Sequence, residues 1–281
     1  MSKYGKPGSK AAALREAVHQ LLLDHAASGE LPTSNRFLYY ELVQRGVLDK
    51  EKTRQRGRGS DQDLSDASKW LRDEGFVPWS WIVDETRSLI LWEYADSVAA
   101  YLRAQVAHAR IDCWDGQPPP LILCESRTFG GVLTRTLAGD YLCPVAATNG
   151  QVGGFLHTNV VPTLLGNTRS VLYVGDFDHQ GAQIEQNTRR VLVREAGDRE
   201  WTRVALTADQ AVGLEVKFGI DRRYKPARTA PKVEVEALGQ SVVTGIVRDA
   251  LDELLPEPLD VVREREDEQR ADAQDRLAES L

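Results

Sequence analysis

The sequence predicts an α+β protein of two domains, in which an N-terminal winged helix precedes an α/β domain with a parallel sheet and a helical C-terminal extension. Three short helical patterns followed by a β-prone hairpin pattern predict the winged helix. Apolar runs that alternate with helical patterns predict the parallel sheet. A run of three prolines, at residues 118–120, separates the two patterns. We place the domains at residues 1–114, 121–206 and 207–281.

Helical periodicity in the N-terminal region predicts helices at residues 10–28, 34–45 and 60–74. Each predicted helix is followed by a glycine, which is a common helix stop. Thr33 and Ser34 offer an N-cap for the second helix, and Ser60 offers one for the third. Residues 77–92 hold two β-prone pieces around a polar turn, which completes the winged-helix outline. A further helix is expected at about 96–112.

After the prolines, short apolar runs end abruptly in polar residues, as buried parallel strands do. The expected strands cover residues 121–125, 142–147, 171–176 and 202–206. Helices are expected between them at residues 127–138, 154–165 and 181–196. We expect residues 207–231 to be irregular, a long helix to begin near Pro231, and the acidic tail 259–281 to favour a helix.

The amino-acid composition limits the classes of protein to which this chain can belong. The chain has 281 residues, of which 42% are hydrophobic, so it can bury a core. It has no apolar run of about 18 residues, so we expect no membrane span. The three cysteines, Cys113, Cys124 and Cys143, lack metal-ligand spacing, which favours a reduced cytoplasm and no structural zinc.

Charge is unevenly spread along the chain, although the net charge is −7. Residues 1–60 carry 11 Lys or Arg against 6 Asp or Glu, and residues 249–281 carry 4 Arg against 12 Asp or Glu. A loop in the basic part suits sequence-independent contact with DNA phosphates, and its candidate DNA-binding residues are Lys52, Arg54, Arg56 and Arg58. An ordinary solvated surface is the alternative for both regions.

Two carboxylates, Asp176 and Asp178, follow the apolar run at 171–174. Residues two apart on an extended strand point the same way, so this pair leaves the strand tip together. Glu125 ends an earlier apolar run, and the carboxyl ends of parallel strands meet at one edge of the sheet. Adjacent carboxylates favour a cation between them, and an all-oxygen set suits Mg²⁺. These three residues are the predicted metal ligands, with solubilising strand-end carboxylates as the alternative.

This Glu followed by Asp-x-Asp resembles the Toprim domain of topoisomerases, bacterial primases and certain nucleases. The resemblance implies that the three carboxylates hold Mg²⁺ and that Glu125 also acts in proton transfer. Thr33-Ser-Asn-Arg36-Phe-Leu-Tyr39-Tyr40 resembles a motif of the topoisomerase VI A-type family, which includes the related meiotic double-strand-break transesterase. Lys232-Val-Glu-Val-Glu-Ala-Leu238 resembles a segment that follows the Toprim domain in that family.

The family resemblance implies that Tyr40 attacks a DNA phosphodiester and that Arg36 positions the phosphate. Helical geometry adds an expectation, because Leu38, Tyr39 and Leu42 share one apolar face. We therefore expect Tyr39 to be core and Tyr40 to be the more exposed of the two. An ordinary half-buried aromatic that stacks on a base is the alternative for Tyr40.

Together these features favour an enzyme that binds and cuts double-stranded DNA with Mg²⁺ by tyrosine transesterification. The family resemblance implies a homodimer in which the Tyr of one protomer faces the metal site of the other, and a nucleoid-associated location. The chain departs from the family at Ser126 and Arg127, where a Lys is usual after the Glu. It also lacks an ATPase domain, so strand passage would need an ATPase or condensin-like partner.

Two alternatives stay open at this point. One is a hydrolytic Toprim nuclease, of the kind found in plasmid or phage defence or in DNA processing, which cuts without a covalent intermediate. The other is a noncatalytic DNA-binding component of a larger complex.

Overall fold

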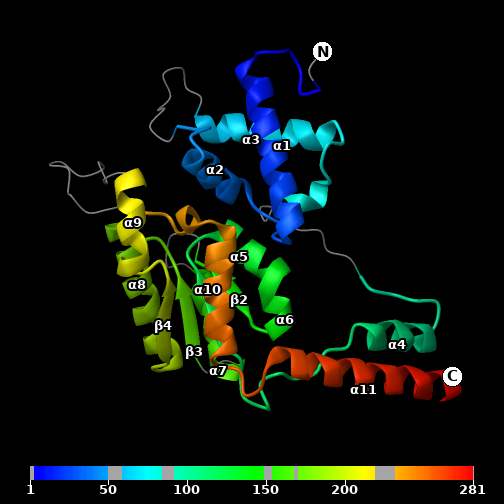
Figure 1. Ribbon diagram of the computed structural model, residues 1–281. Coiled ribbons are helices and arrows are strands. Elements are labelled where there is room, and N and C mark those ends of the chain that lie inside the picture. The colour runs from blue at the N-terminus through cyan, green and yellow to red at the C-terminus, as the bar shows by residue number, and fades with distance from the viewer. Residues whose placement is uncertain are drawn as a thin grey trace.

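The computed structural model describes residues 3–49, 59–83, 92–148, 154–167, 170–218 and 232–280. This part of the chain is an α+β structure in which helices predominate and four strands form one parallel sheet (Figure 1). The predicted α+β class and parallel sheet are confirmed.

The N-terminal helices are α1 (Lys10–Ser28), α2 (Asn35–Gln44) and α3 (Ser60–Asp73), close to their predicted bounds. The Ser34 hydroxyl caps α2 by accepting a hydrogen bond from the Phe37 N–H. The three helices pack around a shared hydrophobic cluster, and a short 3-10 helix, η1 (Trp79–Trp81), follows α3. Half of the expected hairpin, residues 84–91, lies outside the described residues. In the described half the first β-prone piece forms η1 and one parallel bridge, between Ile82 and Thr33, where a hairpin strand was expected.

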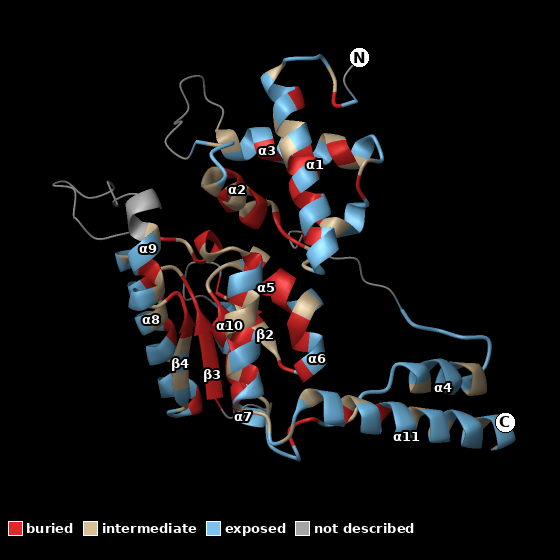
Figure 2. Ribbon diagram, in the orientation of Figure 1, coloured by how far each residue is buried: buried red, intermediate tan, exposed pale blue. Residues whose placement is uncertain are grey.

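The sheet has the strand order β2-β1-β3-β4 and is parallel throughout. Both of its faces are buried, because alternate residues of the central strands join different hydrophobic clusters. The buried strands are visible in Figure 2. The bounds of the strands are β1 (Leu121–Cys124), β2 (Val145–Ala147), β3 (Ser170–Val174) and β4 (Glu200–Ala205).

Helices cover the two faces of the sheet, as the alternating pattern predicted. Residues of α5 and α10 join the hydrophobic cluster on one face, and residues of α7 and α8 join the cluster on the other. The elements are α5 (Arg127–Leu133), the π-helical turn η2 (Thr134–Ala138), α6 (Gly139–Tyr141), η3 (Leu156–Val160), α7 (Val161–Asn167), α8 (His179–Ala196) and α10 (Gln240–Asp252).

Two expectations for the region after β4 were wrong. Residues expected to be irregular form α9 (Ala208–Phe218), and the helix expected from Pro231 begins only at Gln240. Before it, the chain is extended and forms a short 3-10 helix, η4 (Val235–Leu238). The extended part arises from tertiary contact, because Val233 and Phe177 exchange two backbone hydrogen bonds.

The helix α11 (Leu259–Ser280) lies beside α4 (Val98–Ala107), away from the sheet (Figure 1). Glu266 joins this pair to the rest of the chain. Its buried side chain accepts a hydrogen bond from the Ile111 N–H and forms ion pairs with Arg110, Arg263 and Arg270. None of the helices in the described part of the chain has both the length and the apolar character needed to cross a bilayer.

The helix α2 connects the N-terminal helices to the sheet because its residues divide between two cores. Leu38 and Leu42 are buried in the cluster that α1 and α3 share. Phe37 and Tyr40 are buried in the cluster on one face of the sheet, where Phe37 lies edge-on to Phe129 with ring centres 5.7 Å apart. The helix is thereby held directly beside the carboxyl ends of β1 and β3.

Candidate functional site

The three predicted metal ligands emerge from one edge of the sheet. Cys124 and Val174 are paired as the last residues of β1 and β3, and the Glu125 N–H donates a hydrogen bond to the Val174 carbonyl, 2.9 Å away. Asp176 therefore leaves its strand next to Glu125. Asp178 follows as the N-cap of α8. The expected position of all three residues at the carboxyl ends of neighbouring strands is confirmed.

Each of the three carboxylates accepts a backbone hydrogen bond. Glu125 accepts one from the Asp176 N–H at 3.1 Å, and Asp176 accepts one from the Val235 N–H at 3.0 Å. Asp178 accepts one from the Gly181 N–H at 2.7 Å. Among the described residues, no three acidic, His or Cys side chains are arranged to hold a metal ion. The structure thus brings the residues together without forming a cation cage.

Electrostatics indicates that these carboxylates lie close to one another. Burial raises the pKa of Glu125, and the charge of Asp178 raises it further. Burial, followed by the charges of Glu236 and Glu125, raises the pKa of Asp176 to about 8. At Glu125 these effects outweigh the charge of Arg203, which lowers the pKa. The all-oxygen donors of the site fit a hard divalent cation.

Arg203 fixes the backbone that carries Asp176. Its guanidinium donates hydrogen bonds to the carbonyl oxygens of Gly175 and Asp176, both at 2.8 Å, and to that of Leu206 at 2.8 Å. It also pairs with Glu185 of α8. Arg203 therefore orders the loop between β3 and α8 through its backbone, and its own charge is engaged by Glu185.

The expectation that Tyr40 is the more exposed tyrosine was wrong. Tyr40 is 2% exposed, whereas Tyr39 is half-buried and its hydroxyl lies 3.2 Å from the Ser60 hydroxyl. Helical periodicity indicates one apolar face of α2, but the helix has two, and Tyr40 lies on the face that packs on the sheet domain. Burial and the neighbouring Glu234 raise the pKa of Tyr40 far above its ordinary value.

Arg36 and Tyr40 both bind carboxylates of the segment before α10. The Tyr40 hydroxyl donates a hydrogen bond to Glu234 Oε2, and Arg36 Nη2 lies 2.7 Å from the same oxygen. Arg36 Nε lies 3.0 Å from Glu236 Oε1, and the Ser126 hydroxyl donates a hydrogen bond to that oxygen at 2.9 Å. Arg36, predicted to position a phosphate, here forms ion pairs with two carboxylates.

Glu234 and Glu236 were not predicted from the sequence as site residues. The segment was expected to be helical, so its two carboxylates were not considered with those at the sheet edge. A signal was present, because Val233 and Val235 alternate with Glu234 and Glu236, and period-two alternation is typical of an extended segment. The Val235 N–H bond to Asp176 places this segment against the acidic edge.

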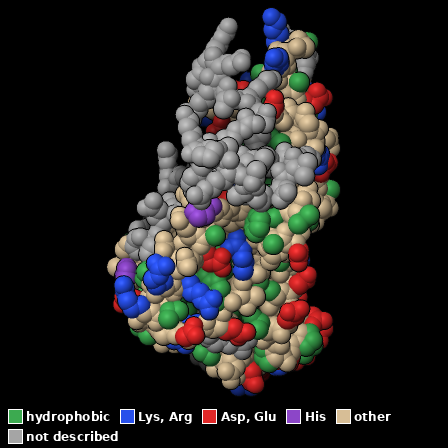
Figure 3. Space-filling view, turned by 90° about the vertical axis from the view of Figure 1, so that its left-hand side faces the viewer, with side chains coloured by type: hydrophobic (Ala, Val, Ile, Leu, Met, Phe, Trp, Pro, Cys, Tyr) green, Lys and Arg blue, Asp and Glu red, His purple; other side chains and the backbone are tan. Residues whose placement is uncertain are grey.

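The predicted DNA-binding residues Lys52, Arg54, Arg56 and Arg58 lie outside the described residues. Figure 3 shows the side of the molecule that faces left in Figure 1, and there Lys and Arg side chains are interspersed with Asp and Glu. No large basic field is visible in the coloured part of this face, so the DNA contact remains a prediction.

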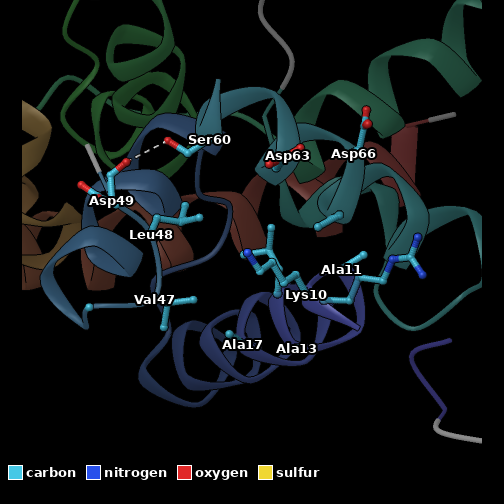
Figure 4. Close-up of a pocket in the computed structure, with 14 residues that line it drawn as sticks. Lys10, Ala11, Ala13, Ala17, Val47, Leu48, Asp49, Ser60, Asp63 and Asp66 are labelled. Atoms are coloured by element: carbon cyan, nitrogen blue, oxygen red, sulfur yellow. Dashed lines mark hydrogen bonds between the residues drawn. The ribbon is translucent and has the colours of Figure 1, made fainter. Parts of the chain in front are cut away.

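A separate hollow of about 850 Å³ lies among the N-terminal helices (Figure 4). Alanine and leucine side chains of α1 and the chain near Leu48 supply much of its lining, with Lys10, Asp63 and Asp66 among the polar residues. The hollow contains none of the acidic residues at the sheet edge. We therefore place the candidate site at the carboxylates, where the chemically reactive groups gather.

Because Gly181 has no side chain, the backbone of the loop after β3 can pass close to this residue. A Cβ at this position would overlap the backbone oxygen of Asp176 and lie 3.3 Å from Glu125 Oε2. We expect Gly181→Ala to lower the free energy of unfolding by roughly 1–3 kcal/mol, because the backbone must shift. Urea unfolding measures this change.

Gly245→Ala is the matched control for that variant. Gly245 lies within α10, and a Cβ there would meet nothing within 4 Å. This change should raise stability by roughly 0.5–1 kcal/mol, because alanine favours a helix over glycine. Equal effects of the two changes would contradict the close packing at Gly181.

Comparison of the chain with protein families, curated proteins and solved structures found no match.

Proposed function

We propose that the protein is a Mg²⁺-dependent DNA-cleaving protein of the topoisomerase VI A-type family, with a winged helix at 1–114 and a Toprim-like domain at 121–206. One observation carries the proposal. The helix that bears Arg36 and Tyr40 is packed against the sheet edge that bears Glu125 and Asp176, more than 80 residues later in the chain. A nucleophile, a phosphate-binding cation and acidic ligands are the groups that phosphodiester cleavage requires.

In the proposed reaction, the Tyr40 oxygen bonds to phosphorus as the bond from phosphorus to one sugar oxygen breaks. The tyrosyl proton passes to a base, and the departing sugar oxygen takes up a proton. The product is a phosphotyrosyl link and a free DNA hydroxyl. Arg36 orients the phosphate, since a guanidinium holds two phosphate oxygens at once.

Glu125, Asp176 and Asp178 are the residues that would hold Mg²⁺. When bound, the ion supplies positive charge that stabilises the phosphate and the leaving oxygen. The residues themselves hold the loop after β3 in place through their backbone hydrogen bonds.

Glu234 binds Tyr40 and Arg36, which are the two groups that a DNA phosphate would need to contact. It accepts the Tyr40 hydrogen bond and pairs with Arg36, so phosphate binding must displace it from both. Tyr40 in this state touches the acidic segment of its own chain, and the arrangement across two protomers implied by the family remains a proposal. The binding of double-stranded DNA, the homodimer, and the ATPase or condensin-like partner are also proposals.

Tyr40→Phe tests the transesterase mechanism. We expect the parent protein with Mg²⁺ to break supercoiled plasmid into products that need protease treatment to enter a gel, because the ends are protein-linked. Tyr40→Phe should reduce these products to background, since phenylalanine has no nucleophilic oxygen. Tyr39→Phe, one residue away, should cleave as the parent protein does.

The burial of Tyr40 favours a second candidate function, which is hydrolytic cleavage by the same acidic site. Parent-like cleavage by Tyr40→Phe, with ends free of protein, would establish that candidate and eliminate the transesterase. A noncatalytic DNA-binding component of a larger complex is the remaining alternative. It would be supported if Glu125→Ala changed nothing in any DNA assay and calorimetry detected no Mg²⁺ binding.

A further inference from the structure

Glu236 is a fully buried carboxylate with one uncommitted oxygen. Its exposed fraction is 0%, and its Oε1 atom is held by the Ser126 hydroxyl and by Arg36. Its Oε2 atom has no hydrogen-bond partner among the described residues. Burial of an ionised carboxylate is costly unless each oxygen is compensated. A positively charged or proton-donating group at Oε2 would therefore lower the free-energy cost of burying Glu236.

Glu236 is also a close neighbour of Asp176. The residue before it, Val235, donates its N–H to Asp176 Oδ1 at 3.0 Å. Among the charges that act on Asp176, that of Glu236 has the largest effect. Arg36 lies 3.0 Å from Glu236 and is already shared with Glu234, which Lys232 also approaches. These two cations face three carboxylates, Asp176, Glu234 and Glu236, so negative charge is in excess when all three are ionised.

The uncommitted Oε2 atom of Glu236 is suited to bind a cation directly, because hard divalent cations take carboxylate oxygens as ligands.

We infer that Glu236 is a further ligand of a hard divalent cation, which it shares with Asp176. The inference rests on the proposed metal site and extends it across the segment that connects the sheet to α10. Its donors are carboxylate oxygens, which suit Mg²⁺ or Mn²⁺. A proton shared by Glu236 and Asp176 is the competing arrangement, and it requires no metal.

The test is Mg²⁺ binding by the full chain without DNA, measured by calorimetry and by the rise in melting temperature that Mg²⁺ causes. We expect Glu236→Gln, which keeps the shape but loses the charge, to weaken Mg²⁺ binding by about 10–100-fold. Glu253→Gln is the control, because it removes the same charge from an exposed glutamate at the end of α10. This variant should bind Mg²⁺ within about twofold of the parent.

Glu236→Asp is a second variant, which keeps the test valid if Glu236→Gln does not fold. It keeps the negative charge but shortens the side chain by one methylene. It should also bind Mg²⁺ more weakly. Parent-like binding by both Glu236 variants would overturn the inference, and so would a parent protein that binds no Mg²⁺. If those variants bind normally while Glu125→Gln does not, the proposed metal site survives without Glu236. Mg²⁺ binding without DNA cleavage would instead reject the proposed function and leave the inference standing.

Discussion

Phe37→Ala is expected to lower the free energy of unfolding by about 3–5 kcal/mol, which is the usual cost of removing a fully buried phenylalanine. Phe37 is 0% exposed and lies edge-on to Phe129. With Tyr40, it is also a residue through which α2, held on its other side by α1 and α3, packs on the sheet domain. The cavity left by the truncation would therefore open between the two cores.

Urea unfolding followed by circular dichroism measures this loss. Phe155→Ala is the matched control, because Phe155 is 47% exposed and its truncation should cost less than about 1 kcal/mol. A loss at Phe37 as small as that at Phe155 would show that α2 does not depend on the sheet domain for its position. The same variant should increase the exposure of Tyr40, one turn further along the helix.

Asp176→Asn is expected to stabilise the protein at pH 8 without divalent cations, by roughly 2 kcal/mol. The pKa of Asp176 is raised from 3.8 to about 8, chiefly by burial and by Glu236. A shift of this size corresponds to an upper bound of roughly 6 kcal/mol. The asparagine amide must also be desolvated, so the expected gain is smaller. Its oxygen can still accept the Val235 N–H bond.

The pH dependence of this gain has a definite sign. Between pH 3.8 and about 8 the folded state retains a proton on Asp176 that the unfolded state releases. The parent protein therefore loses stability as pH rises through this range, and Asp176→Asn lacks that loss. The stability of Asp176→Asn relative to the parent should be lowest below pH 4 and highest above pH 8.

Thermal unfolding at pH 5 and pH 8 tests this prediction. Asp198→Asn is the control, because Asp198 is exposed and its replacement should change stability by less than about 0.5 kcal/mol at either pH. An Asp176→Asn variant that is less stable than the parent at pH 8 would refute the electrostatic account of the site.

The strands and the three acidic residues could be predicted from sequence because their signal is local. The apolar runs of β1 and β3 end where Glu125 and Asp176 begin, and the parallel topology follows from the helices between the strands. A local signal for α9 was present but overlooked. Thr207 and Gln210 exchange side-chain and backbone hydrogen bonds as a capping box, the Thr-x-x-Gln pattern that begins a helix.

The rest of the site could not be predicted because it depends on contacts between distant parts of the chain. Tyr40 is buried by the sheet domain, and Glu234 meets it from 194 residues further along. The extended form of the segment that carries Glu234 comes from its pairing with Phe177. Helical periodicity within α2 gives no information on such a second packing surface, so the acidic residues that hold Arg36 and Tyr40 could not be inferred from it.

The ion-pair hub at Glu266 has a mechanical consequence for α11. Three arginines and one backbone N–H converge on this single carboxylate near the start of the helix. Ser280 lies 14 residues beyond Glu266, about 21 Å along the helix axis at 1.5 Å per residue. Of these four groups, Arg263 and Arg270 belong to α11 itself, so Arg110 and the Ile111 N–H are the ones that connect the carboxylate to the segment after α4. The position of the last 21 Å of α11 therefore depends on its packing against α4.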